Sequence, residues 1–149
     1  MPQDKQKVHK LEFDQELDFL LVGIISGHKD YRLCFELNKA LSLEMHRCKD
    51  LVLSAGRPGS STSHAWFTYG GNGRENYHLI GNRDLDHTGF YIPEMRNVDY
   101  FILIHGAAGN FELDKVVDQL RQLQVVSAAF VIEPAELKSA ETFLILLEN

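Results

Sequence analysis

Two carboxylates and one histidine border an apolar run in the second half of the chain. Glu94 and Asp99 stand at the start of the run 98–104, and His105 follows it. Two carboxylates at the mouth of a strand could act as acid and base, or could bind a divalent cation, since hard cations prefer oxygen ligands. If all three groups converge at one end of a sheet, they would form the site of a small hydrolase or a ligand-sensing enzyme.

The same residues also allow a structural interpretation. Glu94 and Asp99 could accept hydrogen bonds from backbone N–H groups or pair with Arg96 or another basic side chain, and so fix the turn that feeds the strand. His105 could be a hydrogen-bonded structural histidine. We favour this interpretation because no nucleophile, metal triad or histidine partner stands at a catalytic spacing. The seven histidines never form HxH, HExxH or a Cys/His metal pattern, so neither a metal nor another cofactor is predicted.

Two further segments could bind a ligand or a partner. Trp66, Tyr69 and Tyr77 could form an aromatic surface, for which core packing and a partner-facing hairpin are both better explanations than base stacking. Gly106 and Gly109 follow the apolar run and could expose backbone N–H groups to an anion at a helix N-terminus. An ordinary tight connection is the simpler explanation, because the sequence lacks the lysine of a phosphate-binding loop and places acidic residues in the first helical turn.

The elements that must position these residues follow from the apolar pattern. The runs 17–25 and 98–104 are nearly continuous, which is typical of central strands covered on both faces. Helical spacing predicts one helix over 29–42 and another that Asn110 would cap. The other predictions are a loop over 54–63 and strands over 43–47, 51–53, 65–69, 76–80, 125–132 and 143–147, with the strands 65–69 and 76–80 forming a hairpin.

These elements predict an α+β fold, in which a mainly antiparallel sheet carries both helices on one face. The order of elements also suggests two strand–helix–strand–strand units. Residues 1–10 are predicted to be a polar arm, and residues 11–149 a single α+β domain, as the length of 149 residues suggests.

Composition narrows the partners and the compartment. The net charge of −6 makes nucleic acid an unlikely partner, although Lys5, Lys7 and Lys10 together with the aromatic hairpin leave RNA binding as a weaker alternative. The longest apolar run is too short to span a membrane, and no secretory signal is apparent. We therefore expect a cytoplasmic protein with no membrane partner, in which Cys34 and Cys48 are reduced thiols.

One stretch resembles a known signature. Ile92, Pro93, Glu94, Val98, Asp99 and Tyr100 match the pattern that names the bacterial IPExxxVDY family, and the segment 37–41 is similar to another part of that family. The family has no established activity, cofactor or catalytic residues, so the resemblance implies no mechanism. The leading hypothesis is a non-enzymatic binding or adaptor domain, a homodimer or a partner of another protein, which uses a sheet edge or the aromatic hairpin. The sequence leaves open whether the protein is an enzyme, although the absence of a catalytic spacing favours a protein that is not one.

Overall fold

A six-stranded antiparallel sheet organises the chain in the computed structural model, which describes residues 17–54, 59–70 and 75–148. The strands run in the order β2 (His46–Arg47), β5 (Trp66–Tyr69), β6 (Asn76–Gly81), β7 (Tyr100–His105), β1 (Leu20–Ile25) and β8 (Ala128–Ile132). Every neighbouring pair is antiparallel. The two apolar runs become β1 and β7, which pair with each other inside the sheet, as predicted for strands buried on both faces.

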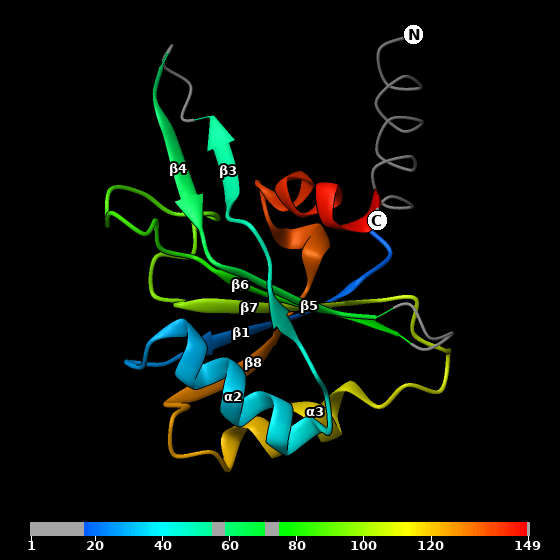
Figure 1. The fold of residues 1–149 in the computed structure, drawn as a ribbon. Coiled ribbons are helices and arrows are strands. Elements are labelled where there is room, and N and C mark those ends of the chain that lie inside the picture. The colour runs from blue at the N-terminus through cyan, green and yellow to red at the C-terminus, as the bar shows by residue number, and fades with distance from the viewer. Residues whose placement is uncertain (1–16, 55–58, 71–74, 149) are drawn as a thin grey trace, which may run out of the picture.

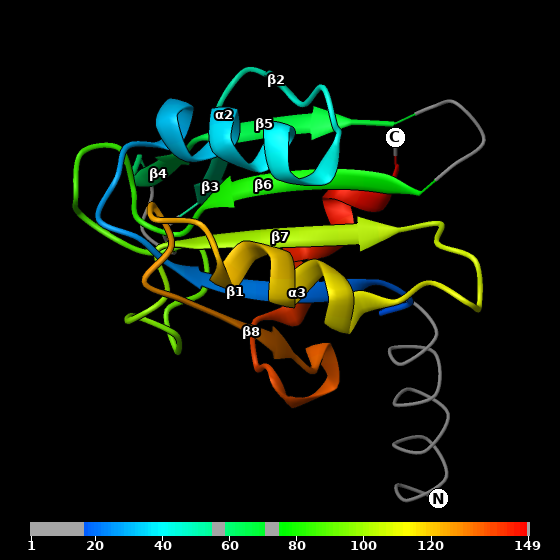
Figure 2. The same cartoon turned by 90° about the horizontal axis from the view of Figure 1, so that it is seen from below.

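Both α-helices cover one face of this sheet (Figure 2). Helix α2 (Asp30–Leu41) buries Leu33, Cys34 and Leu37, and α3 (Leu113–Arg121) buries Val116, Val117 and Leu120. These side chains share a core with alternate residues of the central strands, among them Val22, Ile24, Ile102 and Ile104. The predicted α+β fold, with a mainly antiparallel sheet and two helices on one face, is confirmed.

The opposite face has its own cover (Figure 1). The hairpin of β3 (Leu51–Ser54) and β4 (Ser61–His64) lies on this side, with the 3₁₀ helices η1 (Pro134–Glu136) and η2 (Ala140–Glu148) beside it. The ring of Phe143 is fully buried and its centroid lies 5.3 Å from that of Phe101 and 5.4 Å from that of Tyr91. This second core explains why β1 and β7 are apolar at nearly every position rather than at alternate ones.

Three predictions about single elements are wrong. The segment 143–147 is part of a 3₁₀ helix instead of a strand, and it buries Phe143 and Leu146, three residues apart, on the second core. The second half therefore lacks the last strand of a strand–helix–strand–strand unit. The segment 54–63, predicted as a loop, contains the start of β4, whose polar residues pair with β3. Asn110 does not cap α3, because the N-cap residue is Glu112.

Some predictions can be placed only in part. The polar arm, residues 1–10, lies outside the described residues, as do residues 71–74 of the predicted hairpin turn. Both cysteines are free, and burial raises the pKa of Cys34 to about 11, so this thiol is protonated and unreactive at neutral pH. Within the described ranges, the helices are too short or too polar to span a lipid bilayer.

Candidate functional site

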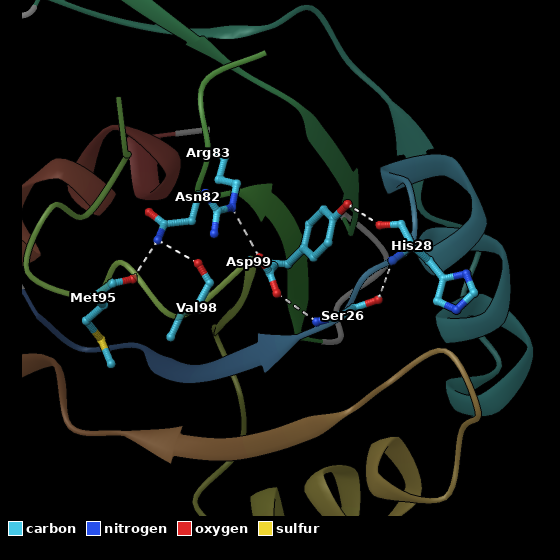
Figure 3. A network of polar contacts seen from close by, with 8 residues as sticks. Ser26, His28, Asn82, Arg83, Met95, Val98 and Asp99 are labelled. Carbon is cyan, nitrogen blue, oxygen red and sulfur yellow. Dashed lines mark hydrogen bonds and ion pairs between the residues drawn. The ribbon is translucent and has the colours of Figure 1, made fainter. Parts of the chain in front are cut away.

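The turn 92–98 is built around the side chain of Asn82. This residue follows β6 directly and is fully buried. Its amide nitrogen donates hydrogen bonds to the carbonyl oxygens of Met95 and Val98, both at 2.8 Å (Figure 3). Its amide oxygen accepts a hydrogen bond from the Ile92 N–H at 2.8 Å. One amide therefore fixes both ends and the middle of the turn that leads into β7.

Asp99 joins the ends of three strands at the exit of this turn. Its Oδ2 accepts a hydrogen bond from the N–H of Ser26, just after β1, at 2.9 Å. Its Oδ1 lies 3.3 Å from Nε of Arg83, which follows β6 (Figure 3). The Asn82 N–H also donates to the Asp99 carbonyl at 2.9 Å. The carboxylate is thus held by one backbone donor and one guanidinium, which agrees with the structural interpretation of this residue.

Hydrogen bonds continue from Asp99 into the connection between β1 and α2. The Ser26 hydroxyl donates to the Val125 carbonyl at 2.6 Å and accepts from the His28 N–H at 3.2 Å. The Tyr100 hydroxyl donates to the His28 carbonyl at 2.7 Å. Burial, assisted by negative charge nearby, raises the pKa of Tyr100 to about 12, so this hydroxyl remains a hydrogen-bond donor at neutral pH.

An open pocket of about 440 Å³ adjoins this network at the end of the sheet. Ser26, Arg83 and Asp99 line it together with Asp84. The hydrogen bond from the Thr88 hydroxyl, with others from backbone N–H groups that include Ser63 N–H at 2.7 Å, lowers the pKa of Asp84 to about 2. Asp84 is therefore a carboxylate with its oxygens occupied, which does not suit a general acid or base.

Glu94 has a different partner from Asp99. Its two carboxylate oxygens accept hydrogen bonds from the Ser139 N–H at 2.7 Å and from the Ser139 hydroxyl at 2.8 Å. Burial would raise the pKa of Glu94, but the hydrogen bonds from Ser139 and from the backbone of Glu94 and Lys138 together outweigh burial and lower it. Glu94 thus ties the turn 92–98 to Ser139, which immediately precedes η2.

We expect the Glu94→Gln variant to lose about 1–2 kcal/mol of unfolding free energy, because a charged acceptor of two hydrogen bonds is replaced by a neutral one. Urea unfolding followed by circular dichroism measures the loss. Glu141→Gln is the matched control, since Glu141 is exposed on η2. In the Ser139→Ala background, Glu94→Gln should cost less than in the wild type; equal costs would show that the two side chains do not interact.

His105 lies at the opposite end of β7 from Asp99. The two residues are six positions apart along an extended strand, a separation of about 20 Å. His105 pairs in register with Asn76 at the start of β6, whereas Asp99 lies near the end of β6. The hypothesis that Glu94, Asp99 and His105 converge at one end of the sheet is therefore wrong.

His105 belongs instead to a chain of three rings on the face opposite the helices. Its Nε2 lies 3.1 Å from Nε2 of His78, and the two imidazoles are stacked with an interplanar angle of 10°. His78 is only 3% exposed, and its Nδ1 accepts a hydrogen bond from the Trp66 indole N–H at 3.1 Å. Because Nδ1 is an acceptor, the neutral His78 carries its proton on Nε2 and donates it to His105.

Burial disfavours the protonated form of both histidines. Burial, with the nearby His105 as a second cause, lowers the pKa of His78 to about 4, and burial also lowers the pKa of His105. Nδ1 of His78 accepts from Trp66 and its Nε2–H donates to His105, so both ring nitrogens have hydrogen-bond partners. In the described ranges, no group of three or more His, Cys, Asp or Glu side chains is arranged around a common metal position.

The predicted binding residues do not share a surface. Tyr77 is buried and Tyr69 packs beside it in the core under the helices, while Trp66 packs on the opposite face of the sheet. Gly106 has a φ of +75°, which explains glycine at that position. The N-cap of α3 is Glu112, whose carboxylate pairs with Lys115 at 2.6 Å, so negative charge already occupies that helix end.

Sequence reasoning singled out Glu94, Asp99 and His105 but missed Asn82, Arg83 and Ser26. Ser26 and Asn82 directly follow a strand and Arg83 comes one residue later, which is the one signal that the sequence offers for them.

The fold and its hydrogen-bonded turn define an α+β protein with an antiparallel sheet covered on both faces. No protein-family model matches the chain, and no curated protein or solved structure matches it either.

Proposed function

We propose that the protein is a non-enzymatic binding domain that acts through a contact with another protein. Glu94 and Asp99 are engaged in hydrogen bonds that hold the turn 92–98 and its neighbours together. His105 is about a strand length away from them. Acid–base catalysis by these groups would require all of them to reach one substrate through hydrogen bonds, and their separation does not allow this. Their structural role therefore favours a binding function over a catalytic one.

The observation that carries this proposal is the outward face of α2. Tyr31 is 67% exposed and Phe35 is 58% exposed, and residues four apart lie on the same face of a helix. The Lys39 ammonium lies 5.4 Å from the centroid of the Phe35 ring. Exposed aromatic side chains are enriched where proteins bind one another, because they bury a large apolar area on contact.

We further propose that the partner is a second copy of the chain. Two-fold dimers are the commonest oligomers, and a two-fold contact would bring the Tyr31–Phe35 surface of one copy against the same surface of the other. The predicted aromatic hairpin does not serve this purpose, since Tyr77 is buried and Tyr69 is partly covered. The outer edge of β8, where Val131 is 48% exposed, is the other surface that could pair with a second copy.

Light scattering on the purified protein over a range of concentrations tests the proposal. The wild type is expected to have a dimeric mass at high concentration, and Phe35→Ser is expected to weaken the dimer by about tenfold or more, as for an aromatic residue at the centre of an interface. Val131→Lys, which would block edge-to-edge pairing through β8, is expected to leave the mass unchanged.

The outcomes separate the possible contacts. Loss of the dimer in Val131→Lys but not in Phe35→Ser would assign the contact to β8 and contradict a role for α2. A monomeric wild type would contradict the dimer. In that case, capture of one protein from the native cell by the wild type but not by Phe35→Ser would still support a binding domain, and equal capture by both would overturn it.

Membership of the bacterial IPExxxVDY family is supported by the residues of the 92–100 motif. A cytoplasmic location is supported by the composition and by the two free cysteines.

A ligand-sensing role is the second candidate function. The pocket beside Asp99 and Arg83 favours it, because charged groups of both signs and the Tyr100 ring meet there at the open end of the sheet. The hydrolase alternative receives no comparable support, since His105 lies at the other end of the strand.

A further inference from the structure

A larger pocket, of about 760 Å³, lies on the side of the sheet opposite the helices. The β3–β4 hairpin, the loop after β6, the turn 92–98 and the C-terminal 3₁₀ segment all contribute to its wall. Its lining includes two arginines, Arg83 and Arg96, and one histidine, His87, but no aspartate or glutamate among the described residues. The wall is therefore basic in a protein whose net charge is −6.

The two arginines share one aromatic ring. The guanidinium carbon of Arg83 lies 5.3 Å from the centroid of Phe90, and that of Arg96 lies 5.7 Å from the same centroid. Two like charges beside one ring repel each other, and an anion between or beside them would relieve that repulsion. Leu53 and Pro93 add apolar surface to the same pocket.

The hydrogen-bonding groups of the pocket are unequally occupied. Arg83 is partly neutralised by Asp99 at 3.3 Å, and the Ser139 hydroxyl donates to Glu94. Arg96 has its contact with Phe90 and no carboxylate partner within the described part of the chain. A guanidinium with free donors, next to an apolar ring, suits an oxyanion attached to an apolar group.

We infer that this pocket binds a small organic oxyanion, a phosphate monoester or a carboxylate, through Arg96 and Arg83, with the apolar part of the ligand against Phe90. The inference is independent of the proposed dimer, because α2 lies on the opposite face of the sheet (Figure 1).

Titration calorimetry with phenyl phosphate, benzoate and inorganic phosphate tests the inference. At least one of the two aromatic anions should bind saturably, with a dissociation constant on the order of 0.1–1 mM. Arg96→Gln should weaken that binding by about ten- to a hundredfold, as expected for the loss of charge-assisted hydrogen bonds. Arg96→Lys, which keeps the charge but not the planar donor pair, should fall between the wild type and Arg96→Gln.

Arg32→Gln is the matched control, because Arg32 is an exposed arginine on α2, away from the pocket. Circular dichroism checks that each variant is folded, which we expect because Arg96 is exposed. Absence of saturable binding of both aromatic anions below about 10 mM would overturn the inference. So would equal losses of affinity in Arg96→Gln and Arg32→Gln. Binding of inorganic phosphate as tightly as phenyl phosphate would contradict the role of Phe90.

Discussion

The Asn82→Ala variant is expected to lose about 3–5 kcal/mol of unfolding free energy, because the substitution leaves buried backbone groups without partners. The Asn82 amide holds the carbonyls of Met95 and Val98 and the N–H of Ile92. Val98 and Ile92 are fully buried, so water does not readily replace the lost bonds. Urea unfolding, followed through the fluorescence of the single tryptophan, Trp66, measures the effect.

Two comparisons make this prediction specific. Asn97→Ala changes the same residue type in the same turn at an exposed position, and we expect a change of about 0.5 kcal/mol or less. Asn82→Asp keeps the shape and one acceptor but places a carboxylate oxygen against two carbonyl oxygens, so we expect it to be at least as harmful as Asn82→Ala. If Asn82→Ala and Asn97→Ala cost the same, the amide does not hold the turn.

The pH dependence of stability provides the second large effect. His78 has a pKa of about 4 in the folded protein, against 6.5 for an exposed histidine. As the pH falls from 6.5 to 4, the unfolded chain takes up a proton at this position and the folded protein does not. The contribution of His78 to the free energy of unfolding is therefore complete above pH 6.5. It falls by about 3 kcal/mol as the pH is lowered to 4. The lowered pKa of His105 acts in the same direction.

The His78→Gln variant isolates this contribution. We expect it to be less stable than the wild type at pH 7.5. Near pH 4.5 its stability should equal or exceed that of the wild type, because the variant lacks the buried histidine whose protonation destabilises the fold. Other titrating groups affect both proteins equally, so the difference reports on His78. Urea unfolding at the two pH values gives the difference. His46→Gln, at an exposed position on β2, is the control and should keep the pH dependence of the wild type. A difference between His78→Gln and the wild type that does not change with pH would contradict the prediction.

The sequence allowed the layers of the fold to be predicted because apolar periodicity is local. The continuous runs that became β1 and β7 and the helical spacing of α2 and α3 each lie within one short window. The segment 143–147 was misassigned because a short, wholly apolar run fits a strand or a buried helical turn equally well. Strand β4 was missed because serine and threonine at the start of a strand resemble a loop.

The candidate site was much harder to predict, since its partners are distant in sequence. Asp99 meets the Ser26 N–H across 73 positions, and Glu94 meets Ser139 across 45. Neither pairing follows from spacing or residue type. The interpretation of Glu94 and Asp99 as hydrogen-bond acceptors agrees with their contacts, and Arg83 is the basic side chain that pairs with Asp99. His105 does not join Glu94 and Asp99 because residues at the two ends of one extended strand lie at opposite ends of the sheet.

The position of Asn82 has a consequence for recognising related sequences. Its amide oxygen accepts a hydrogen bond from the backbone N–H ten positions later, and its amide nitrogen donates to the carbonyls thirteen and sixteen positions later. Asn82 and the 92–100 motif therefore form one structural unit. Chains that carry the motif and fold in this way should retain an asparagine ten residues before its isoleucine. In chains where that asparagine is absent, the spacing or the proline of the motif should have changed as well. Searching for the pair would therefore separate true structural relatives from chance matches to nine residues.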